Sequence, residues 1–584
     1  MKNVKRKTQN RGFSLLEVIV GTALMLTVFL SVFGVLNAGI KLVGLSKAKA
    51  GALALASEQM ENIRNRPYGD IGTAGGIPAG DVPQTSTISL NGIEYARRTL
   101  IQYVDSPKDG EGANDENGIA ADYKKIKVEM TWPSASHSVA LVSDIMPKGI
   151  ETTAGGGTLI INVLDAGVQP VSLASIHIEN SSVVPSVSLD VFTNAQGRVI
   201  FPGSPSASNY EITVTKENYS AAQTYTADAI NVNPEPRHLT IIEGETTEAS
   251  FVIDKVSAKT VRTWEPIKDF SWSDSFDDWS KISSSSNVQI NADKAELAQE
   301  TPPLYFDSGF LMSVDIGGID RLNKWNELSW SDAEPAGTDI KYQVGYYSGP
   351  DFVLIPDADL PGNSLGFENS PVDLSGLSTT TYNNLNLRAN LRASDINFTS
   401  SLLDWRIGWK AGPFPLPNTP FHMRGQKTIG SDALSAPIYK YSENLATNSS
   451  GQSQINNLEF DVYDITVNGS VAGYDISESC PPQPVNILPD TSNSADLYLV
   501  NHTSNTLLVK VKNAMGSIIS GASVRLYKSG YDATKTSGDC GQSFFNSLSV
   551  AEYTAEASKT GYDTVSTAMD VSGQTTLEII MNEL

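Results

Sequence analysis

The sequence predicts an α+β N-terminal part, made of one long helix and a small antiparallel sheet, followed by mainly all-β tandem sandwich domains. Three observations lead to this fold class. Residues 13–66 contain no proline and begin as a continuous apolar run. Apolar and polar residues then alternate in many short segments, as strands with one buried face require. A chain of 584 residues is also too long for one hydrophobic core, which favours several domains.

The boundary between leader and apolar run has two unusual residues. The first twelve residues carry five basic side chains and no acidic one, and the apolar run extends from Phe13 to about Leu36. Gly12 precedes this run, whereas the small-residue cleavage site of a secretory signal follows its apolar region. Glu17 lies inside the run, where a carboxylate costs on the order of 2.5–3.5 kcal/mol at mid-bilayer and therefore needs a partner.

The segment Gly12-Phe13-Ser-Leu-Leu-Glu17 resembles the class III signal of type IV prepilins. The resemblance implies that prepilin peptidase cleaves the bond between Gly12 and Phe13 and methylates the new amino group of Phe13. It also implies that Glu17, the fifth residue of the mature chain, pairs with the Phe13 amino group of a neighbouring subunit during assembly. The alternative is an ordinary signal anchor with an incidental glutamate.

The helix is expected to cover residues 13–66 and to end at Pro67. About 54 residues of α-helix are roughly 80 Å long. Its first half is apolar all round and suits a bilayer or a filament core. In its second half one face is apolar and is expected to pack on a soluble head; this face is formed by Leu53, Ala56, Met60 and Ile63.

Residues 67–150 are expected to form the pilin β head as an antiparallel sheet. Apolar and polar residues alternate strictly within 125–132. The pattern Asp122-Tyr-Lys-x-x-x-Val128-x-x-x-Trp132, together with the helical segment 54–64, resembles the V-type minor pilins over about the first 150 residues. The expected strands are 85–90, 94–104, 123–132 and 138–146.

An acidic segment between two of these strands is a candidate calcium site. Calcium binds six to eight oxygen atoms from flexible loops, and clustered carboxylates supply them. The spacing does not match the EF-hand loop, so a solvated acidic loop is the alternative, and no other cofactor is expected. The candidate ligands are Asp105, Asp109, Glu111, Asp115 and Asp122.

An internal repeat organises much of the remaining chain. A polar turn with glycine leads each time to a strand that contains a tyrosine; the three copies are 193–197 with Tyr210, 447–451 with Tyr463, and 537–541 with Tyr553. The segment 508–524 before the third copy resembles the carboxypeptidase regulatory-like, or transthyretin-like, sandwich. We therefore expect three such modules, 155–256, 417–500 and 505–584, the second one degenerate. They either bind a ligand or serve only as spacers.

Residues 264–412 differ in composition, because they hold seven of the eight tryptophans. Period-two alternation in 385–392 and 404–409, with turn-rich segments between, predicts a jelly-roll-like β-sandwich. The segment resembles carbohydrate-binding-like jelly rolls. Exposed tryptophans stack well on sugar rings, although half or more of them are expected to fill the core.

Cysteine content and charge agree with an exported chain. Cys480 and Cys540 lie in the part expected outside the cytoplasm, where disulfides persist, so we expect them to be bonded; two buried free thiols are the alternative. The formal charge is −23, and removing the five basic residues of the leader leaves −28. Such a surface argues against nucleic-acid binding over a broad face, while a small local basic patch remains open.

The sequence indicates no enzyme. Gly362-Asn-Ser364-Leu-Gly366 fits the Gly-x-Ser-x-Gly pattern, but it lies in an expected loop instead of a strand-to-helix turn. The chain contains no His-Glu-x-x-His, His-x-x-Glu or Walker-type phosphate loop.

These features predict a minor type IV pilin that sits at the tip of a pilus or along it at low density and displays its modules for adhesion to a surface glycan or protein. The expected partners are prepilin peptidase, other pilin subunits, the assembly machinery and the bacterial inner membrane before export to the cell surface. The alternative is a pseudopilin-like component of a secretion or assembly machine with spacer modules. A third hypothesis is an envelope hydrolase on a pilin anchor. No motif identifies the ligand.

Overall fold

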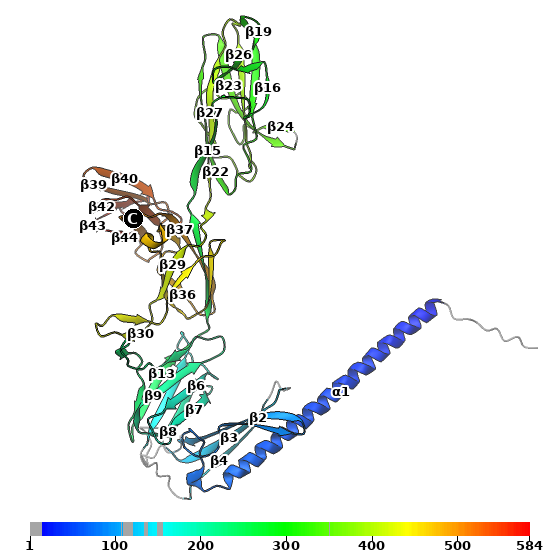
Figure 1. Cartoon of the computed structure of the whole chain (residues 1–584), viewed down its shortest axis with the longest axis vertical. Helices are drawn as coiled ribbons and strands as arrows, with labels where there is room; N and C mark the ends of the chain where they lie inside the picture. Colours follow the sequence, from blue (N-terminus) through cyan, green and yellow to red (C-terminus); the bar gives the residue numbers. More distant parts are fainter. Residues whose placement is uncertain (1–14, 107, 109–120, 134–137, 149–155, 350) are drawn as a thin grey trace, which may run out of the picture. The chain divides into compact units, whose positions relative to one another are not determined.

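The computed structural model describes residues 15–106, 108, 121–133, 138–148, 156–349 and 351–584 (Figure 1). One long helix is followed by β-sheet domains, which confirms the predicted fold class. The chain divides into two compact units. Unit 1 contains the described residues up to Val256 together with Lys427–Lys440, and unit 2 contains Ser257–Gln426 and Tyr441–Leu584.

Helix α1, Leu15–Arg64, packs on a four-stranded antiparallel sheet through its C-terminal part (Figure 1). The buried face is formed by Ala48, Ala52, Leu55, Ala56, Met60 and Ile63. Leu53 was expected on this face, but it is 48% exposed. The reason is geometric: at about 100° per residue, the buried face is centred near Ala52, and Leu53 points a quarter turn away from it.

The sheet of the head is a meander of consecutive strands. Its strand order is β1-β2-β3-β4, and its expected strands agree with the structure to within one residue at each end. Its face towards α1 contributes Tyr95, Ile101, Ile126 and Val128 to the core. The elements are the short 3-10 helix η1 (Tyr68–Asp70), β1 (Thr85–Leu90), β2 (Ile93–Val104), β3 (Tyr123–Thr131) and β4 (Val139–Ile145).

The first sandwich follows the head in unit 1. Its two sheets have the orders β10-β9-β6-β7, with β12 beside β9, and β13-β5-β8. The strands are β5 (Gly156–Leu164), β6 (Ser175–Asn180), β7 (Val187–Phe192), β8 (Arg198–Pro205), β9 (Ala207–Thr215), β10 (Ala222–Gln223), β12 (Leu239–Ile241) and β13 (Thr246–Val252).

A hairpin from far along the chain completes unit 1. It is formed by β30 (Thr428–Ser431) and β31 (Pro437–Tyr439), and β30 pairs with β11 (Asn233–Pro234). Asn231 Nδ2 and the Glu235 backbone N–H both donate to Ile429 O, at 2.8 and 3.0 Å. The region 417–500 was expected to form one module, but its residues 427–440 belong to unit 1.

The second sandwich is assembled from two separated segments of unit 2. Strand β14 (Ser257–Glu265) pairs in parallel with β37 (Ser492–Asn501). The expected module began at 417 and lacked this strand, because a parallel pairing across more than 200 residues leaves no local signal. The other elements are β28 (Phe414–Pro415), β29 (Pro420–Gly425), β32 (Ser442–Ala446), β33 (Gln452–Leu458), β34 (Asp461–Thr466), α2 (Gly469–Ala472), β35 (Tyr474–Cys480) and β36 (Val485–Ile487).

Residues 268–411 form a sandwich inserted between β14 and β28, which we call the insert domain. Its sheets have the orders β17-β18-β27-β22-β25, with β15 beside β27, and β16-β21-β26-β23-β24. The strands are β15 (Lys268–Asp274), β16 (Ile282–Ser286), β17 (Val288–Ile290), β18 (Ala295–Leu297), β19 (Gln299–Thr301), β20 (Leu304–Tyr305), β21 (Ser308–Ser313), β22 (Leu322–Ala333), β23 (Thr338–Ser348), β24 (Asp351–Leu354), β25 (Val372–Asp373), β26 (Asn386–Ala393) and β27 (Ser401–Ala411).

The C-terminal sandwich ends the chain. Its sheets have the orders β41-β38-β44 and β40-β39-β42-β43. The strands are β38 (Thr506–Asn513), β39 (Ser523–Lys528), β40 (Tyr531–Thr536), β41 (Gln542–Phe545), β42 (Ala551–Ser558), β43 (Val565–Val571) and β44 (Gln574–Met581).

The internal repeat of the sequence occupies equivalent places in these three sandwiches. In each, the first and last strands pair in parallel: β5 with β13, β14 with β37, and β38 with β44. The repeated glycines have φ of 67–69°, and a Cβ there would lie 2.5–2.9 Å from a first-strand carbonyl oxygen, so glycine is required; they are Gly197, Gly451 and Gly541. The repeated tyrosines are buried, and each bonds a backbone group four or five residues earlier; they are Tyr210, Tyr463 and Tyr553.

Candidate functional sites: the N-terminal helix, the module junction and the insert groove

The N-terminal part of α1 is an uncovered apolar surface. Its large apolar side chains between residues 15 and 45 are 47–80% exposed. The segment Val18–Arg64 contains a window of 18 residues with a mean hydropathy of 2.4, none of it buried. By length and composition the helix is able to span a membrane. An apolar surface of this extent requires a lipid bilayer or other helices to cover it.

The predicted processing residues lie at the edge of the described chain. Gly12 and Phe13 are outside the described residues. The backbone of Glu17 belongs to the first turn of α1, and its side chain is outside the description. Cleavage at Phe13 and the pairing of Glu17 therefore stay predictions.

Two contacts fix the second part of α1 to the head. Tyr95 Oη donates to Ala48 O at 3.0 Å, and the helix passes over this ring at Gly51. A Cβ at Gly51 would lie 2.6 Å from Tyr95 Oη, so glycine allows the close approach. By contrast, Gly21, Gly34, Gly39 and Gly44 have no atom within 4 Å of such a Cβ.

A buried lysine holds the segment that follows the helix. Lys124 is 1% exposed, and its Nζ donates to Tyr68 O at 2.8 Å and to Ile71 O at 2.9 Å. The ammonium also lies 4.5 Å from the centre of the Tyr68 ring and 5.2 Å from that of Tyr103. These contacts satisfy the buried charge, and they anchor the chain where it leaves α1.

The candidate calcium ligands are only partly described. Asp105 is buried, and Asp122 Oδ2 accepts the backbone N–H of Ser106 at 2.6 Å. Asp109, Glu111 and Asp115 lie outside the described residues. A calcium site in this loop stays a prediction.

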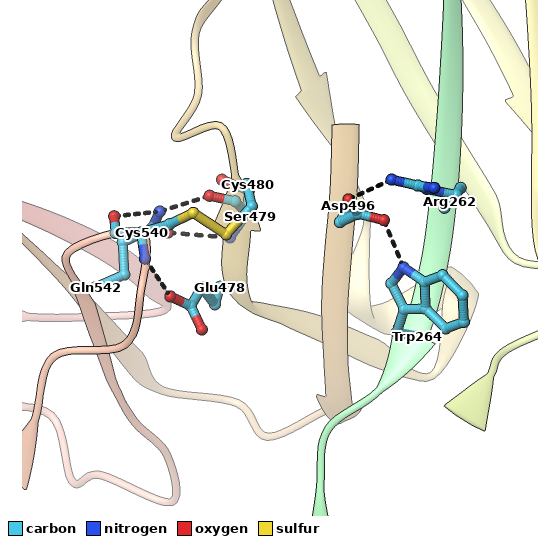
Figure 2. Close-up of a disulfide and its surroundings, with 8 residues drawn as sticks. All are labelled: Arg262, Trp264, Glu478, Ser479, Cys480, Asp496, Cys540 and Gln542. Carbon is cyan, nitrogen blue, oxygen red and sulfur yellow. Dashed lines mark hydrogen bonds and ion pairs between the residues drawn. A yellow bond between two sulfur atoms is a disulfide. The ribbon is translucent and has the colours of Figure 1, made fainter. Parts of the chain in front are cut away.

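Cys480 and Cys540 form a disulfide between the second and the C-terminal sandwiches, with a Cα–Cα distance of 5.6 Å (Figure 2). Beside it, Ser479 N donates to Gln542 Oε1 at 3.2 Å, and Gln542 Nε2 donates to Ser479 O at 2.8 Å. Burial raises the pKa of the Glu478 carboxyl, whose Oε1 accepts the Cys540 N–H at 3.0 Å. Because both sulfur atoms are consumed in the disulfide, this cluster of ligand-type groups is a covalent junction and not a metal site.

A second set of bonds joins the same two sandwiches. Asp475 is 2% exposed; its Oδ1 lies 2.7 Å from His502 Nδ1, and its Oδ2 accepts the Thr503 N–H at 2.9 Å. Gln574 Nε2 donates to the same carboxylate. The junction between the two modules is therefore built from a disulfide and a satisfied buried carboxylate.

Beside this junction, one carboxylate ties β14 into the second sandwich. Asp496 on β37 accepts from an Arg262 guanidinium N–H at 2.7 Å and from Trp264 Nε1 at 2.6 Å (Figure 2). Three residues before Arg262 on β14, Lys259 is 1% exposed. Its Nζ donates to Asn493 Oδ1 at 2.9 Å and to Ser494 O at 3.0 Å. Burial lowers the pKa of Lys259 to about 8. Polar groups on β14 therefore fix it to β37.

The tryptophans of the insert domain mostly fill its core. Trp325 and Trp405 are fully buried, and Trp330 is nearly so; Trp272 and Trp409 pack against them. Trp279 is 44% exposed. Most of the tryptophans in this domain therefore serve its core, because the sandwich needs large apolar side chains there.

A polar groove lies instead on the outer face of the sheet β16-β21-β26-β23-β24. It encloses about 540 Å³, within the range of small-molecule sites. Its lining includes Ser308, Phe310, Lys341, Gln343, Asn390 and Arg392. No motif in the sequence marks this site, but one signal is present: arginine and asparagine alternate with leucine and alanine along the expected strand 385–392. Those alternating polar residues mark one face of a strand.

Ser364 lies in the loop that borders this groove. Its Oγ donates to Asp357 Oδ2 at 2.5 Å. The loop connects strands β24 and β25, so Ser364 does not occupy the strand-to-helix turn that a nucleophile elbow requires.

Comparison with known proteins gives structural neighbours only. No protein-family model matches the chain, and no curated protein matches it. Among solved structures, the Bacillus anthracis TIE protein is 10% identical over 86% of this chain and 73% of that chain, with a TM-score of 0.15. The major pilin subunit of Bacillus cereus is 10% identical over 73% and 99%, and a minor pilin of Streptococcus agalactiae is 15% identical over 30% and 87%, both with TM-scores of 0.13. At such scores, the function proposed below rests on this chain's own residues.

Proposed function

We propose that the chain is a minor subunit of a type IV pilus or a closely related filament. The observation that supports this most strongly is the division of α1. Its first part exposes apolar side chains all round, while its second part is packed on the head. One continuous helix thus joins an apolar environment to a water-soluble domain, which is what a subunit extracted from a membrane into a helical filament core requires.

The residues before the helix supply the processing step of this proposal. Prepilin peptidase cleaves after Gly12 in the membrane, and Phe13 becomes the methylated N-terminus. Glu17 then pairs with the amino group of Phe13 on a neighbouring subunit, and this pairing offsets the free-energy cost of placing a carboxylate in an apolar filament core. The partners are accordingly the peptidase, other pilin subunits, the assembly machinery and the inner membrane.

The large β region favours few copies per filament. Residues 155–584 add 430 residues to each subunit, and such a mass on every subunit would crowd the shaft. A position at the tip, or sparse placement along the shaft, leaves room for the sandwiches at the cell surface. There we assign them a role in adhesion, with the insert groove as the ligand site. A secretion pseudopilin with spacer modules is the alternative class.

The role of Glu17 gives a direct test in the native host. Glu17→Ala should leave the leader cleaved but reduce the amount of the chain in sheared filaments at least tenfold. Glu61→Ala is the matched control, because Glu61 is an exposed residue of α1 that forms a surface ion pair with Arg64. Normal incorporation of Glu17→Ala would contradict the assembly role.

Adhesion is tested separately from assembly. A chain that lacks residues 155–584 should still enter filaments, and these filaments should lose attachment to glycan-coated or cell surfaces. Unchanged attachment, with filaments still formed, would favour the secretion or spacer alternative.

A further inference from the structure

The insert groove is built by side chains that the sheet register places in rows. Phe310 on β21, Asn390 on β26 and Lys341 on β23 are direct cross-strand neighbours. Arg392 has Ser308 on one side and Asp339 on the other. Because successive side chains of a strand point to opposite faces, all these groups share the outer face, while Leu387, Ala389 and Leu391 fill the core behind them.

Hydrogen bonds hold the polar groups of the groove in fixed orientations. Arg388 Nε donates to Asn390 Oδ1 at 3.0 Å, and Asn390 Nδ2 donates to Gln343 Oε1 at 3.0 Å. Gln343 Nε2 in turn donates to Ser364 O at 3.0 Å. This chain of bonds connects β26 to the loop that borders the groove. Leu365 on the same loop is 79% exposed and lines the groove, which gives the polar floor one apolar edge.

The groove lining holds two basic residues, Lys341 and Arg392, in a chain of net charge −23, and Arg388 lies beside the lining on the same face of β26. Arg388 and Arg392 form no ion pair within the described part of the chain. Lys341 pairs with the exposed Glu368, and Asp339 is the one acidic residue in the groove lining. Arg392 in the lining and Arg388 beside it, both without an ion pair among the described residues, favour an anionic ligand, because guanidinium groups bind carboxylate and sulfate-type oxygens through paired hydrogen bonds.

The spacing of the two arginines indicates an extended ligand. They are four residues apart on one strand, which corresponds to about 13 Å and exceeds one monosaccharide. The aromatic ring in the groove is covered, since the Arg388 guanidinium lies 4.6 Å from the centre of Phe310. No flat aromatic face is therefore offered to a nucleobase, as single-strand nucleic-acid binding requires. Hydroxyls, amides and guanidinium groups instead match the hydroxyls and sparse charges of a sugar chain.

We propose that the insert groove binds an oligosaccharide that carries carboxylate or sulfate groups. Arg388 and Arg392 bind its anionic groups, Asn390 and Gln343 its hydroxyls, and Leu365 contacts an apolar face of a sugar ring. The inference deepens the proposed adhesive role and rests on it for its biological setting, but the site is complete within one chain. Densely charged polyanions are disfavoured by the acidic remainder of the protein.

The test uses the full chain in detergent micelles on an array of oligosaccharides with carboxylate groups, with sulfate groups and without charge, followed by titration calorimetry of each binder. We expect an acidic oligosaccharide to bind, its uncharged analogue to bind at least tenfold more weakly, and the affinity to fall as salt is raised. Arg388→Gln and Arg392→Gln should each reduce the affinity at least tenfold. Arg525→Gln is the control, because Arg525 is a surface residue of the C-terminal sandwich.

Three results would overturn the proposal: no acidic oligosaccharide binds, the uncharged analogue binds equally well, or Arg525→Gln weakens binding as much as the groove variants. Tighter binding of a single-stranded oligonucleotide at the same arginines would assign the groove to nucleic acid instead. Thermal unfolding curves that coincide with the wild type exclude misfolding of a variant. Oligosaccharide binding by the insert groove does not depend on how the N-terminus is processed. Failure of the binding test therefore leaves the pilin assignment unchanged, and failure of the pilin assignment leaves the binding result unchanged.

Discussion

The contact between α1 and the head is tested most sharply at Gly51. A methyl group there would lie 2.6 Å from Tyr95 Oη and 3.3 Å from Tyr95 Cζ. Gly51→Ala gains about 1 kcal/mol of helix propensity. It also displaces the Tyr95 ring, which costs the hydrogen bond to Ala48 O, about 1 kcal/mol, and strains a packed core by about 1–3 kcal/mol. The net effect should be a destabilisation of about 1–3 kcal/mol.

Hydrogen exchange followed by mass spectrometry of the full chain in detergent isolates this effect from the other domains. Peptides from 48–64 should exchange about 5- to 150-fold faster in Gly51→Ala, since 1.4 kcal/mol corresponds to a factor of ten. Gly44→Ala is the matched control, because no atom lies within 4 Å of its added methyl group. In a Tyr95→Phe background the cost of Gly51→Ala should fall, as the hydroxyl no longer occupies the space. Equal exchange in Gly51→Ala and Gly44→Ala would refute the packing of the helix on this ring.

Three further predictions concern buried polar groups and the disulfide. The pKa of Lys259 is about 8 in the folded chain against an ordinary value of 10.5. Unfolding therefore takes up a proton between these pH values, and the free energy of unfolding should rise with pH across this window by up to roughly 3 kcal/mol. Chemical denaturation of Lys259→Met should not show this rise with pH. An unchanged pH dependence in the variant would contradict the assignment to Lys259. Lys124→Met should destabilise the head by about 2–4 kcal/mol, measured by hydrogen exchange, because two buried carbonyl groups lose their donor. The control Lys127→Met, at an exposed site, should change the same measurement by less than about 0.5 kcal/mol. Equal effects of the two variants would refute the anchoring role of Lys124. Replacing Cys480 and Cys540 by Ala opens a loop with a sequence separation of 60 and should lower the free energy of unfolding of the two joined sandwiches by up to about 4 kcal/mol, measured by calorimetry. Reductant should lower the unfolding temperature of the wild type but not that of the variant. A wild type whose unfolding temperature does not change with reductant would contradict the disulfide junction.

Local patterns in the sequence predicted much of the fold. The strands of the head were placed within one residue, because strict alternation and flanking turn residues define strand ends. The repeated glycines predicted three related modules, since a left-handed turn that touches a neighbouring carbonyl leaves no alternative residue. The buried face of α1 was placed less accurately, and Leu53 was assigned to it wrongly. On a helix with many alanines and leucines, apolar spacing alone does not locate the centre of the packed face.

What the sequence could not predict depends on residues far apart in the chain. Strand β14 belongs with β37, and Lys259 and Asn493, which bond across this pair, are 234 residues apart. The hairpin 427–440 likewise pairs with Asn233 and Pro234. The insert groove combines side chains from four strands and a loop, and the alternation in 385–392 marks only one of these strands. The tryptophans that set this domain apart in the sequence lie mostly in its core.

The mature N-terminus is the most direct test of the central claim. Mass spectrometry of the protein produced in its own host, digested and sequenced from its N-terminal peptide, should show a chain that starts at N-methylated Phe13. That result would support processing as a prepilin and would place α1 in a filament. A chain that retains residues 1–12, or one cleaved near residue 40, would contradict the pilin assignment and would leave a membrane-anchored or secreted β-sandwich protein.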